Sequence, residues 1–112
     1  MKKIEAIIRE EKLESVRDAL VELGYYGMTV TEVSGRGKQG GVILQWRVED
    51  YEVHFLPKLK LELVVLDEDV YPIMNAIIKG ARTGEKGDGK IFVLPVEDAA
   101  SIRTGKFGID AI

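Results

Sequence analysis

The chain has 112 residues, a formal charge of -3, no cysteine, 46% hydrophobic residues and 31% charged residues. The length suits a single domain over residues 1–112, and the composition argues against a disordered chain. The absence of cysteine excludes disulfides, thiolate metal sites and cysteine catalysis, and the acidic balance argues against nucleic-acid binding. Because the sequence shows neither a signal-peptide pattern nor a long apolar stretch, we expect a cytoplasmic protein.

The first half of the chain predicts a strand, a helix and a second strand. Residues 3–8 alternate between apolar and mostly polar types, which indicates a strand. A helix follows, and Gly24 is well placed to end it. Its apolar stripe is Leu13, Val16, Leu20 and Leu23. The β-branched segment 28–33 predicts the next strand.

The same order of elements recurs in the second half. Alternation predicts a strand over residues 59–65. Asp67 or Asp69 can cap a second helix, and Pro72 favours Asp69 because proline fits only the first turn. A glycine-dotted loop over residues 80–89 precedes a last strand over residues 91–96. The expected buried stripe of this helix is Val70, Ile73, Met74, Ile77 and Ile78.

Two β-α-β units in series predict an α+β fold, a ferredoxin-like βαββαβ sandwich with two helices on one face of a four-stranded antiparallel sheet. The opposite face is expected to carry Ile7, Val33, Val64 and Phe92. These side chains are too apolar to remain in water, so we expect further copies of the chain to cover this face. The alternative is a monomer with scattered surface hydrophobic residues.

About twenty residues, 36–57, separate the second and third strands. A loop of this length in a compact domain is usually functional or disordered. The apolar run 42–44 and Trp46 lie beside Arg47, which indicates a docking surface. The alternative is a hairpin extension that packs on its own domain. His54, the single histidine, has no acidic residue at a useful spacing and is a weak indication of catalysis.

Two glycine-rich turns, residues 35–41 and 83–90, suit phosphate because successive backbone N–H groups can converge on an anion. Lys38, Lys90 and Arg103 can add positive charge. The second turn resembles a P-loop, but Ile91 stands where Ser or Thr would bind magnesium, and a strand follows instead of a helix. With no activated nucleophile, paired catalytic carboxylates or histidine metal site in the sequence, we expect a binding protein and not an enzyme.

Taken together, these features resemble the PII nitrogen regulatory signal-transduction family (GlnB/GlnK type) over essentially the whole chain. The matching segments are residues 1–8, 27–33, 55–58 and 103–105, and the most specific match is Thr83-x3-Gly87-Asp88-Gly89-Lys90-Ile91-Phe92. The resemblance implies a homotrimer that binds adenine nucleotides in clefts between neighbouring subunits and regulates nitrogen assimilation.

The resemblance also implies a role for individual residues. The positions that match the nucleotide site, which takes ATP with Mg²⁺ or ADP, are Ile7, Thr29, Gly35, Gly37, Lys38, Glu62, Val64, Gly87, Asp88, Gly89, Lys90, Phe92 and Arg103. The positions that match the 2-oxoglutarate site are Gln39, Gly41 and Lys58, and Gln39 also matches the residue that helps to hold Mg²⁺. Arg47 matches the loop-tip arginine that enters the channel of an ammonium transporter. Ligands would shift the loop between conformations and so control this docking, the protein reaching the membrane only through the transporter.

Three departures from the family pattern stand out. Tyr51 matches a position that is uridylylated in some members, but the altered sequence 46–51 argues against modification. Ser101 replaces an arginine of many members, and the run 42–44 makes the loop more apolar than usual. They leave open a PII-like adenine-nucleotide sensor with a weak or absent 2-oxoglutarate response. A small ferredoxin-like nucleotide-hydrolysing enzyme and a trimeric regulatory domain without small ligands also stay open.

Overall fold

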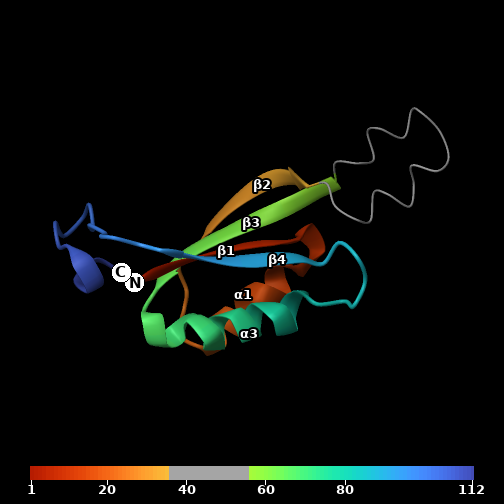
Figure 1. Ribbon diagram of the computed structural model, residues 1–112, viewed down its shortest axis with the longest axis horizontal. Helices are drawn as coiled ribbons and strands as arrows, with labels where there is room; N and C mark the ends of the chain where they lie inside the picture. Colours follow the sequence, from red (N-terminus) through yellow and green to blue (C-terminus); the bar gives the residue numbers. More distant parts are fainter. Residues whose placement is uncertain (36–55) are drawn as a thin grey trace.

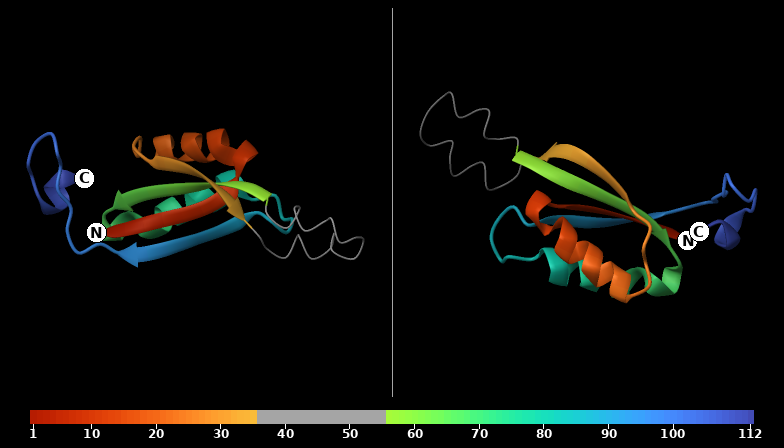
Figure 2. Two further views of the ribbon diagram at one scale, coloured as in Figure 1. Left: turned by 90° about the horizontal axis from the view of Figure 1, so that it is seen from above. Right: turned by 180° about the vertical axis from the view of Figure 1, so that it is seen from behind.

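The computed structural model describes residues 1–35 and 56–112, and predictions that fall on residues 36–55 lie outside them. The described strands are β1 (Lys2–Arg9), β2 (Thr29–Gly35), β3 (Leu56–Val65) and β4 (Gly89–Pro95). The described α-helices are α1 (Leu13–Glu22) and α3 (Val70–Ala81), and short 3-10 turns are η1 (Glu10–Lys12), η3 (Asp67–Asp69) and η4 (Gly108–Ala111). The two α-helices cover one face of the sheet (Figures 1 and 2), which confirms the ferredoxin-like α+β prediction.

The sheet has the strand order β2-β3-β1-β4, and every neighbouring pair is antiparallel. The central strands β1 and β3 therefore pair on both sides, while β2 and β4 each have an open edge within the described chain. Strand β3 begins at Leu56, so the last two residues of the predicted loop 36–57 belong to a strand. Strand β4 begins at Gly89 and ends at Pro95, slightly earlier than the predicted segment 91–96.

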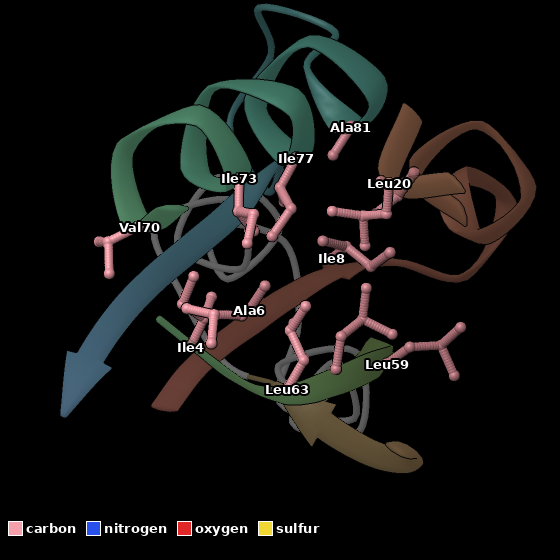
Figure 3. Close-up of a cluster of buried hydrophobic side chains, with 13 residues drawn as sticks. Ile4, Ala6, Ile8, Leu20, Leu59, Leu63, Val70, Ile73, Ile77 and Ala81 are labelled. Atoms are coloured by element: carbon pink, nitrogen blue, oxygen red, sulfur yellow. The ribbon is translucent and has the colours of Figure 1, made fainter. Parts of the chain in front are cut away.

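The hydrophobic core lies between the sheet and the helices, as Figure 3 shows. Alternate residues of β1 and β3 point toward the helices, as the period-two pattern predicted. Gly80 lets the helices approach closely, since a Cβ atom there would lie 3.0 Å from the Cα of Val16. The buried side chains are Ile4, Ala6, Ile8, Val16, Leu20, Leu59, Leu61, Leu63, Val65, Val70, Ile73, Ile77 and Ala81.

Helix α1 ends where Gly24 was expected to end it. Gly24 has φ 89, its N–H donates to the Val21 carbonyl at 2.9 Å, and the Tyr25 N–H donates to the Leu20 carbonyl at 3.0 Å. These two bonds form a Schellman motif, whose left-handed residue is usually glycine. Leu23, the last residue of the predicted apolar stripe, lies at the C-cap and is 45% exposed, because the chain has already turned away from the core there.

Helix α3 has Asp69 at its N-cap position, as predicted, but the carboxylate does not accept a bond from the helix. It accepts a hydrogen bond from the Tyr25 hydroxyl instead. Partial burial together with this bond raises the pKa of Tyr25 to about 12. The prediction that Ile78 is buried was wrong, since it is 45% exposed, and the core-facing residues at this end of the helix are Gly80 and Ala81.

The sheet face opposite the helices carries Ile7, Val33, Val64 and Phe92, as the predicted register required. Phe92 is 52% exposed. Charged residues alternate with these apolar ones, so the face is mixed in character and less apolar than expected. The Lys3 ammonium pairs with Glu62 and, at 3.2 Å, with Glu5, while Lys60 lies 3.9 Å from Glu5.

Candidate functional site

Four separate segments meet at one end of the sheet. Strand β1 ends there at Arg9, β2 ends at Gly35, and the early residues of β3 include Lys58, which pairs in register with Arg9 and Val33. The connection from α3 to β4, residues 82–88, lies at the same end (Figure 1). The fold therefore brings the second glycine-rich turn next to the first residue of the other glycine-rich segment.

The Asp88 carboxylate stabilises the turn by accepting hydrogen bonds from other residues of the same turn. This carboxylate accepts hydrogen bonds from the N–H groups of Thr83 and Gly84, both at 2.9 Å, and from the Thr83 hydroxyl. The Arg9 Nε donates to the same carboxylate at 3.2 Å. These bonds, the Thr83 hydroxyl first among them, hold the pKa of Asp88 well below its ordinary value. The side chain of Asp88 is thus engaged inside the turn.

Gly89 stands where the turn enters the sheet, at a point where no side chain fits. Its φ is 109, and a Cβ atom there would lie 1.7 Å from the Ile7 carbonyl oxygen. Gly84 and Gly87 also have positive φ angles. The backbone of the turn is therefore shaped by glycines, and it exposes main-chain groups where other residues would expose side chains.

Lys58 is a buried cation. Its residue is 5% exposed, and its ammonium donates to the Gly87 carbonyl at 2.6 Å. Gly35 packs on its aliphatic stem, because a Cβ atom at Gly35 would lie 3.1 Å from the Lys58 Cγ. Burial, and to a smaller extent the neighbouring Arg9, lowers the pKa of Lys58. Within residues 1–35 and 56–112 this ammonium has no carboxylate partner at ion-pair distance, so the site can accept an anion.

The sheet places the other predicted residues on the face opposite the helices. Ile7 and Lys90 are register partners on β1 and β4, next to the turn. Thr29 and Glu62 are partners on β2 and β3, and Val64 follows on the same face as Glu62. Phe92 lies on β4, separated from Glu62 by strand β1. The set therefore divides into a β4 side and a β2–β3 side.

Arg103 is not brought to the turn within one chain. Strand β4 leads away from the turn, and the C-terminal segment lies at the opposite end of the sheet (Figures 1 and 2). There an isolated bridge joins Ala100 to Phe107, and the Ser101 N–H donates to the Lys106 carbonyl at 2.9 Å. Seven strand residues alone span about 20 Å, too far for an arginine side chain to return.

Some predicted residues cannot be placed, and one residue at the site was missed. Gly37, Lys38, Gln39, Gly41, Arg47 and Tyr51 lie outside the described residues. Arg9 was not predicted, although its guanidinium bonds both Asp88 and, at 2.8 Å, the Lys86 carbonyl. The signal that could have found it is its place as the last residue of β1, opposite Lys58. The described residues contain no cluster of histidine, cysteine, aspartate or glutamate that could hold a metal ion.

The fold and the site define a small ferredoxin-like protein with a glycine turn and two basic side chains at one end of its sheet. This chain matches the family model described as "Nitrogen regulatory protein P-II" over residues 1–106. It therefore belongs to the P-II family, whose members are signal-transduction regulators that bind small molecules and are not enzymes. This confirms the resemblance that the sequence showed and the prediction that the chain is not an enzyme.

Relatives and a solved structure agree with this membership. The chain is 53% identical, over 112 residues, to nitrogen regulatory protein P-II 2 of Methanothermobacter thermautotrophicus, covering 100% of this chain and 97% of that protein. It is 52% identical to nitrogen regulatory protein GlnK2 of Haloferax mediterranei, covering 100% of this chain and 91% of that protein. The structure of Arabidopsis thaliana PII bound to citrate is similar, with a TM-score of 0.83, 44% identity, and coverage of 99% of this chain and 91% of that chain.

Proposed function

We propose that this chain is a nitrogen-signalling sensor that binds ATP or ADP at its glycine turn and 2-oxoglutarate beside Lys58. The observation that carries the proposal is the 2.6 Å contact between the buried Lys58 ammonium and the Gly87 carbonyl. This contact places Lys58, which can bind a carboxylate, next to the glycine turn, which can bind phosphates. A citrate-bound relative of similar fold supports an anionic carboxylate as one of the ligands.

The nucleotide phosphates would bind along the turn. Positive φ angles at Gly87 and Gly89 let the backbone approach an anion closely, and Lys90 supplies charge at the start of β4. Gly35, Gly37 and Lys38 would close on the phosphates from the other glycine-rich segment. With ATP, Mg²⁺ would take most of its oxygen ligands from the phosphates and the 2-oxo acid, with Gln39 as the protein ligand and Gly41 beside the acid.

The nucleotide site is proposed to lie between subunits of a homotrimer. Two observations support this. The C-terminal segment, which contains Arg103, lies at the end of the sheet opposite the glycine turn, and the residues that match the adenosine site divide between strands β2 and β3 on one hand and β1 and β4 on the other. A head-to-tail ring would bring Thr29, Glu62 and Val64 of one copy toward Ile7 and Phe92 of the next. The open edges of β2 and β4 and the half-exposed Phe92 are the surfaces such a ring would cover.

The long segment between β2 and β3 would carry the signal to a partner. Its ends are attached at Gly35 and Leu56, directly beside Lys58, so ligands at the site can bias its conformation. We propose that Arg47 docks on an ammonium transporter, that Tyr51 stays unmodified, and that the single-domain protein works in the cytoplasm and reaches the membrane through that transporter. No helix in the described ranges is long and apolar enough to cross a membrane.

Calorimetry tests this proposal. ATP, ADP and AMP are titrated with and without 2-oxoglutarate and Mg²⁺, and we expect 2-oxoglutarate to bind only when Mg-ATP is present. Heat from nucleotide but none from 2-oxoglutarate would favour the sensor without a 2-oxoglutarate response. Ser101 motivates that alternative, because its hydroxyl accepts a bond from the Thr104 N–H at 3.3 Å within the C-terminal turn and adds no charge for phosphate. No heat from any nucleotide would contradict the proposal.

A further inference from the structure

Two basic side chains on the sheet bond three consecutive residues of the glycine turn, residues 86–88. The Arg9 guanidinium donates to the Lys86 carbonyl at 2.8 Å and to the Asp88 carboxylate at 3.2 Å. Between these two contacts, Lys58 donates to the Gly87 carbonyl. The Arg9 side chain is only 23% exposed, so it is packed along the end of the sheet rather than extended into solvent. The last residue of β1 and an early residue of β3 thus fix the turn against the end of the sheet.

This arrangement sets the direction of two main-chain donors. In a trans peptide, the C=O of one residue and the N–H of the next point in opposite directions. Because the carbonyls of Lys86 and Gly87 point at Arg9 and Lys58, the N–H groups of Gly87 and Asp88 point away from these cations. Neither N–H donates to an acceptor in the part of the chain that the structure describes. Within the described residues, two adjacent donors are therefore available to an anion.

We propose that Arg9 is a positioning residue of the nucleotide site: by holding Lys86 and Asp88, it aims the N–H groups of Gly87 and Asp88 at the phosphates. Arg9 acts through the turn and adds no phosphate contact of its own. The inference rests on the proposed function, because it assumes that a nucleotide binds at this turn. The inference extends the proposed function, because it states that Arg9, which lies outside the turn, fixes the conformation of the turn.

Replacing Asp88 with asparagine distinguishes the positioning account from a simple charge effect, because the two predict opposite changes in phosphate affinity. The negative charge of Asp88 lies in the turn, so charge alone predicts that Asp88→Asn would tighten phosphate binding. In the positioning account the same change weakens binding. An asparagine keeps one acceptor oxygen but replaces the other with an NH2 donor. The turn then loses either the two bonds that the Thr83 and Gly84 N–H groups donate to one oxygen, or the two bonds that Arg9 and the Thr83 hydroxyl donate to the other. The turn would then lose its fixed shape.

The experiment titrates ADP and, separately, adenosine into the wild-type protein and into Arg9→Gln, Arg9→Lys, Asp88→Asn and the double variant Arg9→Gln/Asp88→Asn, without 2-oxoglutarate. Arg17→Gln, which removes the same charge from an exposed position on α1, is the matched control. We expect the Kd for ADP to rise about tenfold in Arg9→Gln and Asp88→Asn, equivalent to about 1.4 kcal/mol. Arg9→Lys should fall between wild type and Arg9→Gln, because one ammonium cannot serve both contacts at once.

Two further readouts separate positioning from other roles. Adenosine affinity should stay unchanged in all variants, because adenosine carries no phosphate. The Kd of the double variant for ADP should not exceed that of the single variant that binds ADP more weakly, because both changes disturb the same turn. ADP affinity at the wild-type level in Arg9→Gln, tighter binding in Asp88→Asn, or additive losses in the double variant would overturn the inference. If the wild-type protein bound no ADP, the proposed function itself would fail, and this result is distinguishable from equal binding by all variants.

Discussion

Replacing Gly89 with alanine is expected to lower the free energy of unfolding by about 3 kcal/mol or more, or to prevent folding altogether. The methyl group would lie 1.7 Å from the Ile7 carbonyl oxygen, far inside any permitted contact, and the φ of 109 would also be strained for alanine. Relief would require β4 to move away from β1, which breaks the pairing of Ile8 with Gly89 and of Ile7 with Lys90.

Gly84→Ala is the matched control for this prediction. Gly84 has φ 91 in the same turn, but a Cβ atom there meets nothing within 4 Å. It should therefore cost only the backbone strain, about 1–2 kcal/mol. Urea denaturation of the two variants and the wild type measures both effects. Equal losses in the two variants would show that the contact with Ile7 is not what requires glycine at position 89.

Lys58→Met should weaken ligand binding without lowering the stability of the fold. Lys58 is buried and has a lowered pKa, so removing its charge removes a desolvation cost, and the methionine stem still packs under Gly35. We therefore expect unfolding stability to be unchanged or higher. The affinity for 2-oxoglutarate in the presence of Mg-ATP should fall by about 10- to 100-fold, the worth of a charge-assisted hydrogen bond of about 1.5–3 kcal/mol.

Lys60→Met is the control for charge. Lys60 lies two residues further along the same face of β3, and its ammonium is 3.9 Å from Glu5, so the same charge is removed away from the turn. Thermal melts and calorimetry on both variants give the comparison. If Lys58→Met bound 2-oxoglutarate as tightly as the wild type, Lys58 would be removed from the site. A marked loss of stability would instead show that the charge is needed to hold Gly87.

The layers of the fold follow directly from local patterns. Ile4, Ala6 and Ile8 alternate with more polar neighbours, and this period alone places them on the buried face of β1. Gly24 predicts the end of α1 because a left-handed residue is needed there. Ile78 was misassigned because helical periodicity gives the direction of a stripe but not its width, which depends on how closely α1 approaches at Gly80.

The contacts within the site were harder to predict from the sequence than the layers of the fold. The turn 83–90 was recognisable from its glycines, and Gly35 and Lys58 from the resemblance to the P-II family. The role of Arg9 depends on the register that sets it opposite Lys58 and on the curvature of a turn more than seventy residues away in the chain. The engagement of the Asp69 carboxylate by Tyr25 likewise depends on tertiary packing, which overrides the local preference for capping.

Complementation between two defective chains tests most directly the claim that the nucleotide binds between copies. Lys90→Ala and Arg103→Ala each remove one side of the proposed cleft, so each variant, assembled as the proposed homotrimer, should bind ATP weakly while keeping its fold and its oligomeric state. When the two variants are co-expressed with different affinity tags and the mixed trimers are isolated, one cleft in each trimer combines an intact Lys90 with an intact Arg103. We predict that calorimetry will detect a fraction of sites with wild-type affinity for ATP. Mixed trimers that bind no better than the two parents would contradict the account.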